Sequence, residues 1–196
     1  GQPASGLEFG AAVNTDAVSP QSNQFDFYDG GGLDLAVLGL AQADQFGNVN
    51  VSRFGSRLAG AGGFINISQN ARAVVFAGTF TASRQRIALE HGHVKIEKEG
   101  QQPKFLPHVD QITFSGKRAA RLGQPVLFVT ERCVFKLTDR GLQLVEVAPG
   151  IDVERDILAL MQIQPIVEDI AQMDPRIFQD KEMGLRTDLL HLDLPM

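Results

Sequence analysis

Two apolar runs of strand length constrain the fold of this chain more than any other feature. Residues 33–40 read Leu-Asp-Leu-Ala-Val-Leu-Gly-Leu, and residues 73–78 read Ala-Val-Val-Phe-Ala-Gly. A nearly continuous apolar run is typical of a strand that is covered on both faces, as in the parallel sheets of α/β proteins. With the short helices and glycine-rich connections around them, these runs predict an α/β fold, an open and mostly parallel sheet covered by helices.

Shorter patterns predict the remaining elements. Alternating polar and aromatic residues at 24–28 predict a half-buried strand, and residues 49–51 predict a strand that returns after a turn at 44–48. We expect short helices at 64–70 and 116–122, and a helix from the cap Asp152 to about Met161. Further strands are expected at 111–114 and 126–130. Antiparallel hairpins are expected at 87–99 and, in the C-terminal part, at 133–147.

Composition limits the class of protein. Of the 196 residues, 43% are hydrophobic and 21% are charged, as in a globular protein with one domain and at most a small appendage. We expect a domain at residues 1–161 and a tail at 162–196 that packs on it. A net charge of −5 argues against nucleic acid as a partner. Because the chain has no long apolar stretch and no signal-peptide pattern, we expect a cytoplasmic protein without a membrane partner.

The first candidate site is the glycine-rich stretch Gly60, Ala61, Gly62 and Gly63, which precedes an apolar segment. Glycines allow positive φ angles and let a ligand approach the backbone closely. Successive N–H groups in such a turn can face an anion or a developing oxyanion. The alternative is a tight turn before a helix that binds no ligand.

Cysteine and histidine give no second site. The single cysteine, Cys133, lies in an apolar run, so we interpret it as a buried structural thiol. His91 and His93 flank the turn residue Gly92 and are expected to face solvent. Since no cysteine or carboxylate cluster completes a ligand set, we predict no metal.

Several segments together resemble the C-terminal half of family I coenzyme A transferases, most closely the single-chain propionate or acetate coenzyme A-transferases. The resemblance covers about residues 1–185 in the expected order and is carried by residues 3–11, 24–34, 44–51, 60–70, 76–82, 130–135 and 146–152.

The resemblance implies an activity and a mechanism. The activity is exchange of coenzyme A between an acyl-CoA and a carboxylate such as acetate, propionate or acetoacetate, with coenzyme A as co-substrate. A glutamate attacks the thioester and becomes a glutamyl-CoA thioester in a ping-pong sequence, a form of covalent catalysis. This glutamate belongs to a Glu-x-Gly element that is expected just upstream of Gly1. Glu8 is the alternative nucleophile, although it matches a variable position of the family pattern.

The resemblance also assigns site residues. It implies that Gly62 and Gly63, with Gly60 and Ala61, lie beside the thioester and stabilise an oxyanion. The candidates for the acyl pocket are Phe27, Tyr28, Gly31, Gly32, Asn66 and Gln69. Two alternatives stay open: the triple glycine at 30–32 would let two strands pass closely, and Asn66 would cap a helix.

The start of the chain and its partners add further expectations. Because the chain begins at Gly1 without a methionine, we expect a C-terminal portion that is inactive alone. The expected partners are the N-terminal half of the same protein or a separate subunit, together with further copies in a homo-oligomer. The alternatives are an acyl-CoA hydrolase of related framework and a separate noncatalytic subunit that binds coenzyme A.

Overall fold

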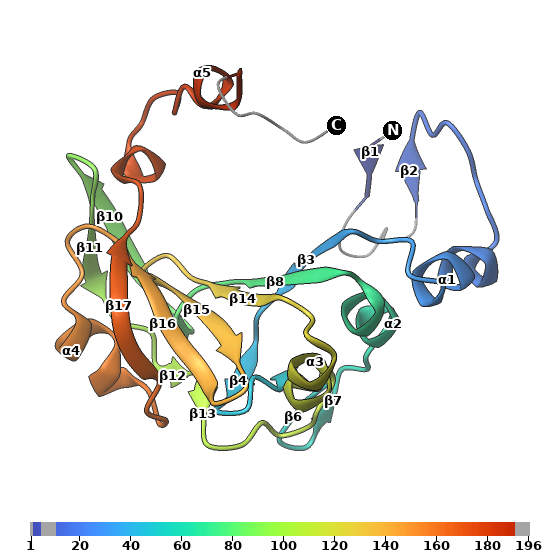
Figure 1. Ribbon diagram of the computed structural model, residues 1–196, viewed down its shortest axis with the longest axis horizontal. Helices are drawn as coiled ribbons and strands as arrows, with labels where there is room; N and C mark the ends of the chain where they lie inside the picture. Colours follow the sequence, from blue (N-terminus) through green and yellow to red (C-terminus); the bar gives the residue numbers. More distant parts are fainter. Residues whose placement is uncertain (1, 5–10, 191–196) are drawn as a thin grey trace.

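The computed structural model describes residues 2–4 and 11–190, so the predictions on Gly1 and Glu8 concern positions outside the described residues. A six-stranded sheet in the order β17-β16-β15-β14-β8-β3 forms its centre (Figure 1). Neighbouring strands are parallel at β3–β8, β8–β14 and β16–β17 and antiparallel at β14–β15 and β15–β16. The expected α/β fold with a mostly parallel sheet is confirmed. The strand bounds are β3 Leu35–Gly39, β8 Ala73–Ala77, β14 Val126–Val129, β15 Cys133–Thr138, β16 Gly141–Val147 and β17 Ile166–Gln172.

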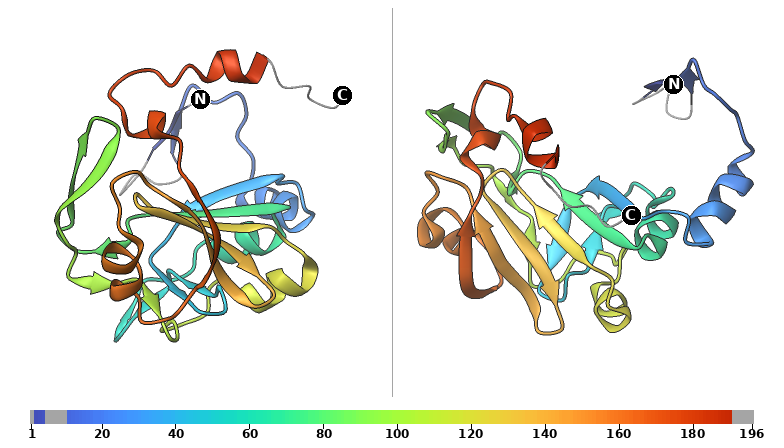
Figure 2. Two further views of the ribbon diagram at one scale, coloured as in Figure 1. Left: turned by 60° about the vertical axis from the view of Figure 1, so that its left-hand side comes forward. Right: turned by 45° about the horizontal axis from the view of Figure 1, so that its top comes forward.

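One face of this sheet carries the main core. Val74, Phe76 and Phe128 point to the same face because side chains alternate along a strand, and all three are buried there. Two helices and a small three-stranded sheet cover them (Figures 1 and 2). The covering elements are α2 Phe64–Asn70, α3 Gly116–Leu122, β4 Gln42–Asp44, β5 Val49–Asn50 and β13 Phe105–Leu106.

The opposite face has a smaller core at its β15 end. Val134 packs there with Met173 and Phe178 of the C-terminal segment and with Val94 of a hairpin. Farther across the sheet the cover ends, and Leu35 and Val37 of β3 are 55% and 63% exposed. The strand at 33–40 is confirmed, but the expectation that it is covered on both faces is wrong for the described residues.

The remaining elements are short hairpins and helices at the edges. Strand pairs β1–β2, β6–β7, β9–β12 and β10–β11 are each antiparallel. Their bounds are β1 Gln2–Pro3, β2 Ala12–Val13, β6 Arg53–Phe54, β7 Arg57–Leu58, β9 Thr81–Ala82, β10 Arg86–Glu90, β11 His93–Lys98 and β12 Gln102–Pro103. The helices are α1 Gln21–Asp29, α4 Val153–Asp156 and α5 Leu185–Leu190, with 3-10 turns η2 Leu158–Leu160 and η3 Pro175–Phe178.

Three local predictions are wrong. Residues 24–28 belong to helix α1. Pro20 at the start of this helix and Gly30 at its end are boundary signals, and they outweigh the alternation over five residues that favours a strand. Residues 111–114 form only an isolated bridge between Phe114 and Val49. The helix capped by Asp152 ends at Asp156, and a 3-10 turn follows the buried Ile157.

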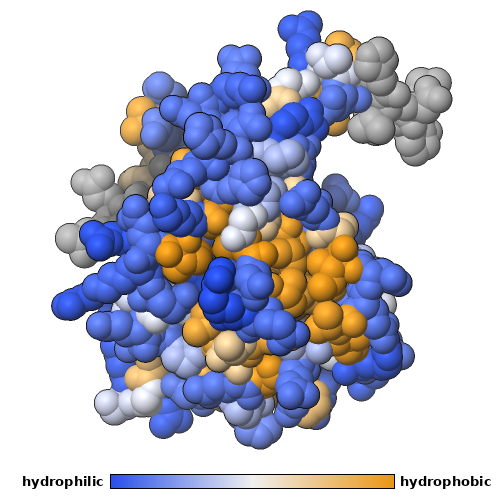
Figure 3. All heavy atoms as spheres, turned by 90° about the vertical axis from the view of Figure 1, so that its left-hand side faces the viewer, coloured by the Kyte–Doolittle hydropathy of each residue, from blue (hydrophilic) through white to orange (hydrophobic). Residues whose placement is uncertain are grey.

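The edge strand β17 was not predicted at all, since the sequence from 162 onward has weak periodicity. Apolar residues gather on the side of the molecule that carries β17 and the β10–β11 hairpin (Figure 3). The exposed large apolar residues of these elements are Ile87, Leu89, Val167 and Ile170. None of the described helices is long and apolar enough to cross a membrane.

The first turn of α3 gives a test of this packing. We predict that Gly116→Ala destabilises the protein by about 2–4 kcal/mol, because overpacking against a rigid neighbour is costly. An added Cβ would lie 2.1 Å from the carbonyl oxygen of Phe46. Helix propensity alone predicts the opposite sign, a gain of about 1 kcal/mol. Urea unfolding of this variant beside Arg121→Ala, an exposed change in the same helix, measures the difference. Equal stability of the two variants would contradict the packing argument.

Candidate functional site

The glycine stretch lies between β7 and α2, and its backbone is left-handed at two positions. Gly60 has φ 85° and Gly62 has φ 52°, whereas Gly63 has φ −82° and precedes the first residue of α2. No atom lies within 4 Å of a Cβ added at Gly60 or Gly62. The backbone conformation, rather than lack of space, therefore requires glycine at these two positions.

A buried polar cluster fixes this turn from behind. The carbonyl oxygen of Ser52 accepts the N–H groups of Ala59 at 2.8 Å and Gly60 at 3.0 Å. The Ser52 hydroxyl lies 2.7 Å from the hydroxyl of Thr113, and the side-chain oxygen of Asn50 accepts the Ser52 N–H at 3.0 Å. Ser52, Thr113 and Asn50 are all buried. The turn is thus held by residues that our sequence reasoning did not select.

Two backbone donors of the turn have no partner. Within residues 2–4 and 11–190, no acceptor binds the N–H of Gly62 or of Gly63. Gly62 is exposed and Gly63 is half-buried. Fixed, unpaired N–H groups at an open surface are the arrangement that an oxyanion or anionic ligand requires.

Helix α1 brings the predicted aromatic residues to the same region. The ring of Phe25 ends 3.0 Å from the position of a Cβ at Gly63, and the Phe27 ring lies 2.4 Å from that of a Cβ at Gly32. Tyr28 packs edge-on against Phe25 with ring centroids 5.6 Å apart. Phe27 is 52% exposed. The triple glycine therefore lets a helix, rather than a second strand, turn tightly into β3.

Asn66 and Gln69 serve different contacts. The Asn66 amide donates to both carboxylate oxygens of Asp29, at 2.9 and 3.1 Å, and so ties α2 to α1. No side chain caps α2, so the alternative of a capping role for Asn66 is not seen. The Gln69 side-chain oxygen accepts the Ser115 N–H at 2.9 Å. Gln69 also lines, together with Gly31, a pocket of about 430 Å³ at the start of the parallel strands.

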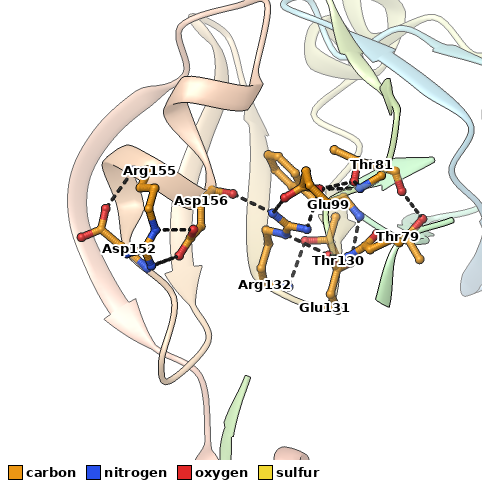
Figure 4. A network of polar contacts seen from close by, with 12 residues as sticks. Thr79, Thr81, Glu99, Thr130, Glu131, Arg132, Asp152, Arg155 and Asp156 are labelled. Atoms are coloured by element: carbon orange, nitrogen blue, oxygen red, sulfur yellow. Dashed lines mark hydrogen bonds and ion pairs between the residues drawn. The ribbon is translucent and has the colours of Figure 1, made fainter. Parts of the chain in front are cut away.

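A second polar centre lies at the carboxyl ends of β8 and β14 (Figure 4). The Arg132 side chain is fully buried and donates to Glu131 at 2.9 Å and to Glu99 at 3.0 Å. It also donates to the carbonyl oxygen of Asp156 at 2.9 Å and lies over the Phe80 ring, 4.7 Å from its centroid. A buried cation is tolerated only when it is paired in this way.

The same region contains a second buried cation. The Lys104 ammonium donates to the carbonyl oxygen of Leu40 at 3.0 Å and to the Thr79 hydroxyl at 3.1 Å. Burial lowers the pKa of Lys104, and the nearby charge of Glu131 opposes that shift. Sequence reasoning missed both Lys104 and Arg132 because, apart from Glu131, their partners are far away along the chain.

The structure confirms the predictions that Cys133 is buried and that His91 and His93 face solvent. Cys133 is fully buried, and burial raises the pKa of its thiol to about 12, so it stays protonated. His91 and His93 are exposed. Among the described residues, no three His, Cys, Asp or Glu side chains group in a way that would hold a metal ion.

Curated relatives match nearly the whole chain, while no family model matches it. The chain is 50% identical over 193 residues to the caffeate CoA-transferase of Acetobacterium woodii, covering 95% of this chain and 37% of the relative. It is 44% identical over 180 residues to the acetate CoA-transferase YdiF of Escherichia coli K12, covering 91% of this chain and 34% of the relative.

Solved structures show the same likeness. The acyl-CoA transferase YdiF of Escherichia coli O157:H7 as apoenzyme superimposes with a TM-score of 0.86 at 43% identity, over 93% of this chain and 36% of that chain. Glutaconate coenzyme A-transferase of Acidaminococcus fermentans, with a TM-score of 0.59 at 20% identity, covers 81% of this chain and 62% of that chain and shares the fold alone.

The fold is that of an α/β protein, and over more than nine-tenths of its length the chain is similar to coenzyme A transferases. It spans about a third of the length of the curated relatives it matches.

The ion pairs of Arg132 predict a pH dependence of stability. Burial would raise the pKa of Glu99, but hydrogen bonds from Arg132 and Thr81 outweigh it and hold this pKa below its usual range. A lowered pKa in the folded state stabilises the protein above the unfolded value, about 4.3, and this stabilisation is lost as the pH falls through the folded value.

We therefore predict that Glu99→Gln lowers stability by roughly 1–3 kcal/mol at neutral pH and flattens the loss of stability on acidification. Urea unfolding between about pH 7 and pH 3 measures both effects. Glu168→Gln, in an exposed pair with Arg140, is the matched control and should change stability by less than about 1 kcal/mol. Parallel pH curves for Glu99→Gln and the unmodified protein would disprove the role of this pair.

Proposed function

We propose that this chain is the C-terminal portion of an acyl-CoA:carboxylate coenzyme A-transferase acting on short-chain acids such as acetate, propionate or acetoacetate. The observation that carries the proposal is the 50% and 44% identity, over more than nine-tenths of the chain, to relatives named caffeate and acetate CoA-transferases. Coenzyme A is the co-substrate in this proposal. Its support is a neighbouring structure, 44% identical, described as a thioester complex with CoA.

The proposed reaction has two matched halves. A glutamate carboxylate attacks the acyl-CoA carbonyl. The C–S bond then breaks, so that CoA departs as a thiolate and an acyl-glutamyl anhydride is formed. The thiolate then attacks the glutamyl carbonyl and releases the first carboxylate, which leaves a glutamyl-CoA thioester. The acceptor carboxylate reverses both steps. The glutamate belongs to the part of the enzyme expected upstream of Gly1, with Glu8 as the alternative nucleophile.

This chain would contribute oxyanion stabilisation and walls of the site. We assign the free N–H groups of Gly62 and Gly63 to the oxyanion, and Gly60 and Ala61 to the shape of the turn beside coenzyme A. The support is the unpaired state of the two N–H groups, together with the exposure of Gly62 and the partial exposure of Gly63. The acyl pocket would be lined from Phe27, Tyr28, Gly31, Gly32, Asn66 and Gln69.

The partners follow from the same proposal. They are an acyl-CoA, a carboxylate acceptor and the N-terminal half of the enzyme, either in the same polypeptide or in a partner subunit, within a cytoplasmic homo-oligomer. Residues 1–161 would form the domain that meets this half, with 162–196 packed on it. The observation behind this is that the relatives are about three times longer than the stretch they share with this chain.

A full-length chimaera tests the function. It contains this chain in place of the matched segment of the Acetobacterium woodii caffeate CoA-transferase. We expect transfer of coenzyme A from acetyl-CoA or propionyl-CoA to an added carboxylate, and a CoA adduct on a glutamate outside this chain by intact mass and peptide mapping. Product formation without an acceptor would favour the hydrolase, and an adduct on Glu8 would change the nucleophile. Binding of coenzyme A without turnover would favour the noncatalytic subunit.

The role of the glycine turn gives a separate prediction. In the chimaera, Gly62→Ala should lower kcat by about 10²–10³-fold, because a side chain at φ 52° shifts the backbone and misdirects a preorganised donor. Gly55→Ala is the matched control, since Gly55 has φ 56°, is exposed, and also has open space around its Cβ position. Steady-state kinetics and thermal unfolding of both variants are compared. Equal kcat in the two variants would remove Gly62 from the mechanism.

A further inference from the structure

The strands β3, β8 and β14 have an apolar face that the described chain leaves open. In the register of the sheet, Val37 lies beside Val75, and Val75 lies beside Leu127. Val37 is 63% exposed, and Val75 and Leu127 are half-buried. Leu35 extends the same face at 55% exposure. We call the surface formed by these side chains of β3, β8 and β14 the β3–β8–β14 face.

The sequence of this face is that of a buried surface. A sheet face that meets water carries polar residues in alternation with buried ones. None of the side chains on the β3–β8–β14 face is polar; they belong to Leu35, Val37, Ala73, Val75, Ala77, Leu127 and Val129, beside Gly39. Uncovered apolar surface of this kind marks an interaction site.

The cover that exists stops partway across the sheet. Met173 and Phe178 bury Val134 on this face, and Leu127 and Val129 lie at the margin of that small core. Helices α2 and α3 pack against the other face. Exposure therefore rises from β15 toward β3, where the described chain provides neither a helix nor a loop.

The unpaired outer edge of β3 is a second sign that a neighbouring element is missing. Among the described strands, β3 pairs only with β8, so its outer edge is open. Natural edge strands are protected by charged residues, proline or bulges, and residues 35–39 contain none of these. The edge can accept a further strand beside Leu35 and Val37.

We propose that the β3–β8–β14 face and the β3 edge are the docking surface for the part of a coenzyme A transferase that this chain does not span. That part would supply an apolar helical layer over Val37 and Val75 and at least one strand beside β3. The curated relatives carry roughly two thirds of their length outside the stretch they share with this chain, enough for both. The identity of the occupant rests on the proposed function, whereas the need for a cover rests on the sheet alone.

Cysteine labelling tests the docking surface. Val37→Cys and Leu122→Cys are made in this chain and in the chimaera, and each is treated with a maleimide and mapped by peptide mass. Leu122 is the control because it is 59% exposed on α3, over the other face. We expect the labelling rate of Val37→Cys to fall at least about 100-fold from the chain to the chimaera, as for a site reached only by local opening. The rate of Leu122→Cys should stay within about threefold.

Cys133 reports on folding in the same experiment. It is fully buried and its thiol has a raised pKa, so it stays unlabelled in a folded chain. If Cys133 reacts in the chain alone, the rates of the two new cysteines are compared within the chimaera, where the same 100-fold difference is expected. If Val37→Cys prevents folding, Leu35→Cys replaces it.

Two outcomes would overturn the proposal. One is equal labelling of Val37→Cys in the chain and the chimaera. The other is protection of Val37→Cys in the chain alone, with a dimer mass by light scattering, which makes a second copy the occupant. Transfer of coenzyme A by the chimaera is assayed separately, so protection without activity would reject the proposed function and leave the docking surface standing.

Discussion

The fold depends on one aromatic ring at the centre of the parallel strands. Phe76 of β8 is fully buried, and its ring contacts those of Phe64, Phe114 and Phe128, with centroids 5.7, 4.9 and 5.4 Å apart. These rings come from α2, from the segment before α3 and from β14. Aromatic contacts of this kind add to the burial of large apolar area. A single strand residue thus joins the sheet to the layer that covers it, and the glycine turn is placed by α2.

The buried Arg132 also joins distant parts of the chain, through ion pairs and hydrogen bonds rather than ring contacts. Its guanidinium binds Glu99 and Glu131 and the carbonyl of Asp156, so it joins three segments far apart in the sequence. Replacing such a group by apolar residues is often neutral, whereas removing one partner leaves a buried charge unpaired. The cluster therefore acts more as a constraint on geometry than as a source of stability. It fixes the loops at the carboxyl ends of the strands, the edge where open α/β sheets bind ligands.

Local pattern predicted the elements whose signals lie within a few residues. The apolar run at 73–78, the helix at 116–122 and the hairpin at 133–147 all form as expected. Helix α1 was missed because alternation over five residues was weighed above Pro20 and the glycines that bound the helix. Strand β17 was missed because its pairing with β16 comes from tertiary contact rather than from periodicity. The glycine turn was selected as a candidate site from its local sequence, whereas its support by Ser52 and Thr113 joins positions 61 residues apart and leaves no local signal.

The error on β3 is informative in a different way. The apolar run predicted a strand with two covered faces, and the described chain covers one. Parallel strands are usually buried on both faces in the complete protein, and their residues are apolar for that reason. An apolar face on such a strand therefore implies a cover, whether or not the same stretch of chain provides it. The glycine turn follows the same logic. Its two N–H groups have no acceptor among the described residues, so the group that would bind them, like the cover of the strand face, lies outside those residues. The glycine turn leads into α2, which packs on the core face of the parallel strands, and the docking surface is the opposite face of those strands. In the proposed enzyme, the remaining part of the protein would complete both.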